Sequence, residues 1–303
     1  MEAELWFWLY RTVFEEHNRK VASGGKKHSG VQFSDALILL VFFWSVLHDR
    51  PRCWACRQEN WPMPWRWLTL PSPSALSRRM RSVSVLLLLE QLLARLAHLQ
   101  AGGLLQLLHV LDGKPWVVGP CTKDRDAKRG RAHDVMANGY RFLASWGAGG
   151  RAVLPEAWTL APLNHDEANL AQADLVGRIP GTGYCLADAM FDQNQLHEQL
   201  GRRGFQLLCP RKRPGTGLGH CWHSPYRLRS IALLEDSASN DFGRRLYALR
   251  SQIERDFGHL VSFGGGLSCL PAWVRTPHRV AVFVAAKLVI NALRLCQIKG
   301  LAA

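Results

Sequence analysis

The sequence predicts a chain of two parts, an all-α N-terminal domain over residues 1–102 and a mixed α/β domain over residues 103–303. Apolar residues recur at helical spacing as far as Gln100, whereas short apolar runs typical of strands begin at Leu104. A glycine pair, Gly102-Gly103, separates the two patterns. Beyond it, three strands are followed by helix, strand, helix and strand, an order that favours a mixed sheet with flanking helices.

The N-terminal part contains a very apolar segment from Ala36 to Leu47, for which Ser34 or Asp35 is a suitable helix N-cap. A membrane span needs about 20 apolar residues, so this shorter run predicts a buried helix. The longer apolar stretches downstream are interrupted by charges at Glu90 and Lys287. We therefore expect no transmembrane helix and no membrane partner.

A basic segment from Pro71 to Ser82 is the best candidate for reading DNA. Ser72 or Ser74 can cap a helix whose first turns would expose three arginines, Arg78, Arg79 and Arg81. A turn followed by such a helix is typical of a helix-turn-helix, in which the second helix enters the major groove. A solvated basic surface helix explains the same pattern equally well. Upstream, the interleaved Trp and Arg residues of 50–67 fit either base stacking or packing between helices.

Charge and cysteine content limit the class of protein. The chain has 38 Lys and Arg against 24 Asp and Glu, a formal net charge of +14. This surplus favours a polyanionic partner such as nucleic acid, although some soluble proteins are simply basic. The eight cysteines show no regular framework, which indicates reduced thiols in a cytosolic protein. Cys53 and Cys56 have the spacing of half a zinc site without a second pair nearby, and the Cys/His group of 209–223 matches no standard spacing.

Two short apolar runs each end in an aspartate. The first, from Leu107, ends at Asp112, and the second, from Tyr184, ends at Asp188. Asp192 lies four residues further on and is an alternative, but only Asp188 follows its apolar run directly. Both runs predict strands that deliver a carboxylate at their ends.

A third carboxylate comes from a helix. Tyr247, Arg250 and Glu254 are spaced by three and then four positions, which places them on one helical face beside an apolar stripe. Alone, this segment reads as an ordinary amphipathic helix with a surface Arg–Glu pair. Together with Asp112 and Asp188, however, Glu254 completes a set of three acids. Gathered like charges are costly unless a cation neutralises them, and Mg²⁺ prefers carboxylate oxygens.

At these residues the chain resembles the DDE transposases of bacterial insertion sequences. The shared features are an Asp at a strand end in Leu-Asp112-Gly-Lys-Pro, a second in Asp188-Ala-Met-Phe-Asp, and the Tyr-x-x-Arg-x-x-x-Glu254 helix. The resemblance covers about residues 104–295. Many members carry a Lys seven positions after the Glu, where this chain has Val261. The resemblance implies a ribonuclease-H-like α/β catalytic domain, with a mixed five-stranded sheet and flanking helices, preceded by an all-α DNA-binding domain.

The resemblance also implies an activity. Asp112, Asp188 and Glu254 would be catalytic and would hold two Mg²⁺ or Mn²⁺ ions for in-line phosphoryl transfer, first cutting DNA at the transposon ends and then joining the 3′-OH to target DNA. Tyr247 and Arg250 would contact the DNA end. The partners would be double-stranded DNA and a second copy of the chain, a homodimer on DNA in the bacterial cytoplasm at the nucleoid.

Several loops are expected to support DNA binding. The polar stretch 123–134 predicts a mobile DNA-facing loop, and residues 210–240 predict a connection to the Glu254 helix that holds a basic loop. Their DNA-binding candidates are Lys128, Arg129, Arg211, Lys212 and Arg213.

Residues 116–119 predict a second strand that pairs with the first as a hairpin, and Asn164 predicts a cap for a helix running to about Ile179.

Two rivals to the transposase hypothesis remain. The first is a metal-dependent nuclease of the same fold that only hydrolyses DNA. The second is a domesticated transposase relative that binds DNA without cutting it, which the missing Lys at Val261 favours and the three acids oppose. A basic structural protein is a third interpretation, and the ordered acids argue against it.

Overall fold

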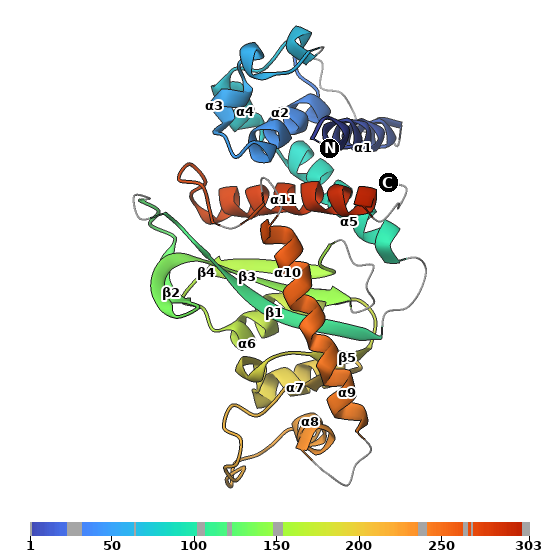
Figure 1. The fold of residues 1–303 in the computed structure, drawn as a ribbon, viewed down its shortest axis with the longest axis vertical. Coiled ribbons are helices and arrows are strands. Elements are labelled where there is room, and N and C mark those ends of the chain that lie inside the picture. The colour runs from blue at the N-terminus through green and yellow to red at the C-terminus, as the bar shows by residue number, and fades with distance from the viewer. Residues whose placement is uncertain are drawn as a thin grey trace. The chain divides into compact units, whose positions relative to one another are not determined.

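The structure, a computed structural model, describes most of the chain: residues 2–22, 32–63, 65–101, 107–119, 123–147, 154–235, 241–262, 266–267 and 269–298. The chain divides into two compact units, which we call the helical unit and the sheet unit (Figure 1). The helical unit comprises residues 1–100, 260–274 and 278–303, and the sheet unit comprises residues 101–259 and 275–277. The expected boundary at Gly102-Gly103 lies outside the described residues.

The N-terminal part is all-α, as predicted. Its helices are α1 (Glu2–Ala22), α2 (Asp35–Leu47), α3 (Arg52–Ala55), α4 (Pro73–Arg79) and α5 (Val83–Ala101), with 3-10 turns at Gln58–Asn60 and Trp65–Trp67. Of the two proposed caps of α2, Ser34 is the one used, because its hydroxyl accepts a hydrogen bond from the backbone N–H of Leu37. Eleven of the thirteen residues of α2 are buried, so this helix forms the centre of the helical unit.

The tryptophans of this part mainly pack the core. Trp6, Trp44 and Trp61 are buried against one another with ring centroids 4.8–5.6 Å apart. The indole N–H groups of Trp44 and Trp61 donate to the backbone carbonyls of Asn60 and Ala55. Of these three rings only Trp61 belongs to the 50–67 region, so helix packing holds there for Trp61, whereas Trp67 is 79% exposed.

The last helix, α11 (Pro277–Ile298), differs from the expected domain division. We expected it to close the second domain, but all of it beyond Pro277 groups with the helical unit. An ion pair of the buried Lys287 contributes to this placement, because Lys287 Nζ lies 2.7 Å from a carboxylate oxygen of the partly exposed Asp49. Among the described helices, one segment, Pro277–Gln297, is long and apolar enough to cross a membrane, but 83% of its apolar window is buried, as in the core helix of a soluble protein.

The described residues of the sheet unit form six strands instead of five: β1 (Leu108–Val117), β2 (Lys128–Ala132), β3 (Val135–Gly147), β4 (Ala157–Pro162), β5 (Gly183–Leu186) and β6 (Phe205–Leu208). The order is β2-β3-β1-β5-β6, and β4 also pairs with β3. The pairs β1–β5 and β5–β6 are parallel, and the others are antiparallel.

Two predictions for this sheet were wrong. The stretch 123–134 is not wholly a loop, because β2 within it forms a hairpin with the start of β3. Residues 116–119 do not return as a second strand of a hairpin, because β1 continues through Pro115 to Val117 and pairs with β3 along its length. Proline fixes φ and lacks the backbone N–H, but β1 can pass through Pro115 because β5 pairs only with Leu108–Val110, so that one edge of β1 has no β5 partner at this point.

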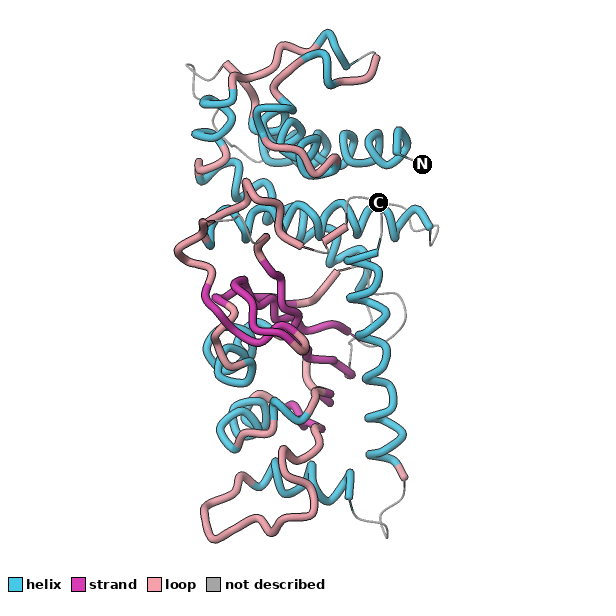
Figure 2. Tube along the Cα trace, turned by 60° about the vertical axis from the view of Figure 1, so that its left-hand side comes forward, coloured by secondary structure: helices cyan, strands magenta, loops and turns pink. Residues whose placement is uncertain are grey.

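Helices flank both sides of the strands (Figure 2). They are α6 (Glu167–Leu170), continued by a π turn (Ala171–Leu175) and a 3-10 turn (Val176–Arg178); a 3-10 turn (Ala189–Phe191); α7 (Asn194–Arg202); α8 (Pro225–Glu235); α9 (Phe242–Ala248); a 3-10 turn (Leu249–Ser251); and α10 (Gln252–Ser262). The cap of α6 is Asp166 and not the predicted Asn164. Helix α8 lies in the connection of residues 210–240.

The two faces of the sheet have different partners. Leu111 and Cys185 belong to the buried cluster that includes residues of α6 and α7. On the opposite face, Phe142 and Trp146 of β3 pack against Phe257 of α10, with ring centroids 6.1 and 6.0 Å apart. Side chains alternate along a strand, so Asp112, next to Leu111, points to the α10 side.

Candidate metal centre on two parallel strands

The register of two parallel strands brings the predicted aspartates together. Leu108 pairs with Tyr184 and Val110 with Leu186, an offset of 76 residues. The same offset, continued past the last pair, sets position 112 beside position 188. Neighbouring parallel strands lie about 4.8 Å apart, and side chains in register point to the same face. Asp112 lies within β1 and not at its end as predicted, because β1 continues to Val117, whereas Asp188 follows the end of β5. The two carboxylates therefore meet just beyond the last paired residues of the two strands.

The structure adds a third carboxylate that the sequence did not single out. One oxygen each of Asp112, Glu167 and Asp188 lies within 4.8 Å of the other two. Glu167 is the first residue of α6, and Gly113 makes room for it, since a Cβ at position 113 would lie 2.7 Å from the Glu167 carboxyl carbon. The only signal in the sequence was an acid at a helix start, which is common in any protein.

Glu254, the predicted third ligand, is not part of this group. It lies in the first turn of α10 and its side chain is exposed. Its charge nevertheless acts on Asp112. Burial raises the pKa of Asp112 most, and the charges of Asp188 and Glu254 raise it further. The structure thus unites Asp112 with Asp188 and leaves Glu254 in their electrostatic neighbourhood.

Two arginines provide the positive charge at the site. A terminal nitrogen of Arg250 lies 3.8 Å from Asp112 Oδ1 and 4.0 Å from Asp188 Oδ2, and Arg141 forms an ion pair with Glu167. The Nε atom of Arg250 is buried and has no hydrogen-bond partner among the described residues. Arg250 therefore makes long ion pairs and retains donor capacity for another anion.

Burial controls the protonation of Asp112. Removal from water raises the pKa of Asp112 to about 6, partly opposed by Arg250 and by the hydrogen bond from the Gly113 N–H, and assisted by Asp188 and Glu254. The folded protein therefore holds a proton at Asp112 more tightly than the unfolded chain does. The raised pKa therefore adds to the free energy of unfolding below about pH 4, and this contribution is lost as the pH rises through about 6.

Asp112→Asn is consequently expected to stabilise the metal-free protein at pH 8. The raised pKa, about two units above 3.8, corresponds to roughly 3 kcal/mol in the free energy of unfolding, and the neutral amide avoids this cost. Urea unfolding of wild type and variant at pH 8 and at pH 4.5 measures this difference in the free energy of unfolding. We expect the variant to be more stable than wild type at pH 8, and by a much smaller margin at pH 4.5. An equal effect at both pH values would contradict the assignment.

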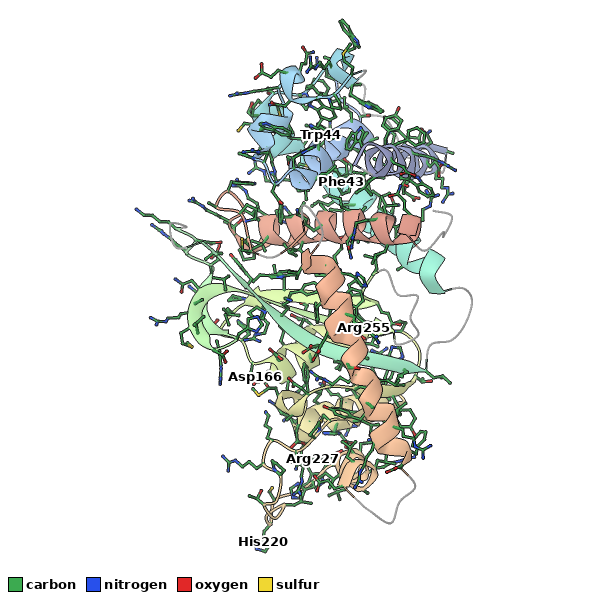
Figure 3. The ribbon with its side chains drawn as sticks, in the orientation of Figure 1. Phe43, Trp44, Asp166, His220, Arg227 and Arg255 are labelled. Atoms are coloured by element: carbon green, nitrogen blue, oxygen red, sulfur yellow. The ribbon has the colours of Figure 1, made fainter. Side chains whose placement is uncertain are left out.

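The alternative aspartate, Asp192, has a different environment. Both its oxygens accept hydrogen bonds from Arg227, at 2.6 and 2.8 Å, and one also accepts from the backbone N–H of Lys212 (Arg227 is labelled in Figure 3). These bonds hold the pKa of Asp192 far below its usual range although burial opposes them. His197 and Cys209 lie close enough to Asp192 to share a metal, but Arg227 already neutralises the carboxylate.

The predicted DNA-reading helix differs in detail. Ser72 caps α4, as one of the two expectations had it, but Arg78 and Arg79 lie in its last turn and Arg81 follows its end. Arg79 forms an ion pair with Asp35 at 2.5 Å, so its guanidinium is already paired within the helical unit. Arg78 and Arg81 are exposed.

The other DNA-binding candidates are dispersed over the sheet unit. Lys128 and Arg129 are exposed at the start of β2, and Lys212 and Arg213 are exposed after β6. Arg211 is paired through two hydrogen bonds, both 2.6 Å long, with Glu235. Tyr247 in α9 is half-buried, and its pKa is raised by burial first and further by Asp188 and Asp112, which places its hydroxyl near the acids.

The chain matches no protein-family model, no curated protein and no solved structure. The transposase resemblance therefore depends on the motifs around Asp112, Asp188 and Glu254. The positions of these carboxylates in the structure are a separate observation about the site.

Proposed function

We propose that the chain is a DDE-type transposase, a metal-dependent enzyme that cuts DNA at transposon ends and joins the 3′-OH to target DNA. The observation that carries the proposal is the meeting of Asp112, within β1, and Asp188, just after the parallel strand β5, with carboxylate oxygens within 4.8 Å. Carboxylates collected in this way on a basic protein favour a cation-dependent reaction on a polyanion.

The topology supports a ribonuclease-H-like fold for the sheet unit. In the path β3-β1-β5-β6, the strand that carries Asp112 lies between an antiparallel and a parallel neighbour. Strand β4 extends the antiparallel side by pairing with β3, and β2 is an addition at the same side. The five-strand core of the proposed fold is therefore accommodated within the six strands.

The donor set fits a hard divalent cation. All three acids of the group offer oxygen atoms, which Mg²⁺ and Mn²⁺ prefer, and no sulfur or imidazole nitrogen belongs to it. When bound, such ions lower the pKa of a water or 3′-hydroxyl and stabilise the leaving oxygen. We assign two ions to Asp112 and Asp188 together with Glu254, the third acid that the family resemblance implies.

Each neighbouring residue has a role in this proposal. Arg250, which bridges the two aspartates at 3.8 and 4.0 Å, would turn its unsatisfied guanidinium toward a DNA phosphate. Tyr247 would position the DNA end beside it. Glu167 would act as a positioning residue that holds Arg141, its ion-pair partner, at the edge of the site.

The net charge of +14 supports a DNA partner, and we extend the proposal to a homodimer assembled on two DNA ends in the bacterial nucleoid. Exposed Lys128, Arg129, Lys212 and Arg213 would contact phosphates without reading sequence.

A plasmid reaction tests the function. The DNA that flanks this reading frame on both sides is cloned into a supercoiled plasmid and incubated with the protein and Mg²⁺. We expect cuts at the outer ends of short inverted repeats, followed by products joined to a second DNA. Cuts without joined products would indicate the hydrolysing nuclease, and binding without cuts would indicate the domesticated relative; either result contradicts the transposase proposal.

A further inference from the structure

A cavity of about 190 Å³ lies within the helical unit, remote in sequence from the acids of the sheet unit. Three segments line it: the end of α2 with the start of α3, the middle of α4, and the start of α11 with the residues before it. The lining residues are Phe42, Ser45, Pro51, Arg52, Cys53, Ser77, Trp273, Val274, Arg279 and Phe283. Among these described residues, two are arginines and none is acidic.

Arg52 is the unusual member of this lining. Its guanidinium lies over the ring of Phe42, 4.9 Å from the ring centroid, and the residue is half-buried. Within the described part of the chain it makes no hydrogen bond or ion pair. Burial, together with repulsion from Arg279 and Arg81, lowers the pKa of Arg52 to about 10. A cationic group that is desolvated beside like charges is costly, and an anion in the cavity would offset that cost.

The apolar part of the lining limits the kind of anion. Phe283 and Val274 are buried, whereas the Trp273 side chain is 37% exposed at the cavity and can stack on a flat group. The cavity is smaller than the 300 Å³ or more typical of sites for drug-sized ligands. Its size and chemistry suit one phosphate group and part of the sugar or base attached to it.

We propose that the Arg52–Arg279 cavity is a phosphate-binding site, in which the two guanidinium groups hold the phosphate oxygens and Trp273 contacts the attached organic group. The phosphate can come from a nucleic acid strand or from a small phosphorylated molecule. Arg81 is exposed and close enough to repel Arg52, so positive charge continues beyond the cavity, which favours the nucleic acid strand. In that form the proposal rests on the DNA-binding function, whereas phosphate binding itself does not.

Three full-length proteins test this site: Arg52→Gln, Arg279→Gln and the control Arg57→Gln. Arg57 lies on the same segment, is exposed and is not part of the lining. Arg52→Gln removes an uncompensated charge, so its melting temperature is not expected to fall, and the exposed Arg279 provides a second variant that leaves the core intact. We expect both cavity variants to bind a short DNA about tenfold more weakly and to reduce the salt dependence by about one phosphate contact.

Cys53 reports occupancy directly, because its thiol is exposed and lines the cavity. DNA, or pyrophosphate as the small-molecule probe, is expected to slow alkylation of Cys53 but not of exposed Cys269, as read by mass spectrometry of each cysteine. Protection by pyrophosphate alone would assign the site to small phosphorylated ligands. No protection by either probe, with unchanged DNA binding by both variants, would overturn the proposal. Neither readout requires Mg²⁺ or DNA cleavage, so a failure of the transposase proposal is detected separately.

Discussion

Asp188→Asn is expected to lower the rate of DNA cleavage and joining by about a thousandfold or more, with binding of duplex DNA retained. The carboxylate lies within 4.8 Å of the Asp112 carboxylate, and an amide cannot replace its charge as a cation ligand. Loss of about 4 kcal/mol of transition-state stabilisation corresponds to this factor. Asp112→Asn and Glu254→Gln are expected to have effects of similar size.

The measurement is a single-turnover assay on the plasmid described above with each variant in Mg²⁺. Asp134→Asn is the matched control, because Asp134 is an exposed aspartate in the turn between β2 and β3. Retention of wild-type rates by Asp188→Asn would remove the active-site assignment. Glu167→Gln is expected to keep most activity, and if it abolished cleavage while Glu254→Gln did not, Glu167 would be the third ligand.

Asp192→Asn is expected to reduce the free energy of unfolding by about 3 kcal/mol or more, although it lies only four residues from Asp188. Its carboxylate is 3% exposed and faces the 15% exposed Arg227, so the variant leaves a buried guanidinium without its counter-charge. Because the folded protein holds the pKa of Asp192 low, the stabilisation is present above about pH 4 and is lost as the pH falls further.

Urea unfolding at pH 7 compares Asp192→Asn with Asp188→Asn as the neighbouring control. Asp188 is part-exposed and lacks such a bidentate partner among the described residues, so its variant is expected to unfold near the wild-type midpoint. Equal stability of the two variants would contradict the distinction drawn between a structural and a catalytic aspartate.

The pair Asp112 and Asp188 could be predicted because each directly follows an apolar run, although Asp112 lies within β1 and not at its end. The contribution of Glu167 could not, since it depends on the absence of a side chain at Gly113 and on the path of α6 beside β1. The exposed position of Glu254 likewise depends on how α10 packs through Phe257, a tertiary contact that helical spacing alone does not contain.

In the fold, too, some elements could be predicted from the sequence and others depend on tertiary contacts. The apolar helix α2 was located to within one residue, since the predicted Ala36–Leu47 is Asp35–Leu47 in the structure. Strand β2 was missed because Lys128–Ala132 carries three basic residues and acquires strand structure only by pairing with β3. The grouping of α11 with the helical unit depends on contacts such as Lys287 with Asp49, 238 positions apart in the sequence.

The most direct test of the central claim is binding of Mn²⁺ to the metal-free protein at pH 8, followed by electron paramagnetic resonance. We predict saturable binding by the wild type and a loss of affinity of about a hundredfold or more in both Asp112→Asn and Asp188→Asn, with Asp192→Asn close to wild type wherever it remains folded. Absence of binding by the wild type, or equal binding by all four proteins, would contradict a cation site built by these two strands.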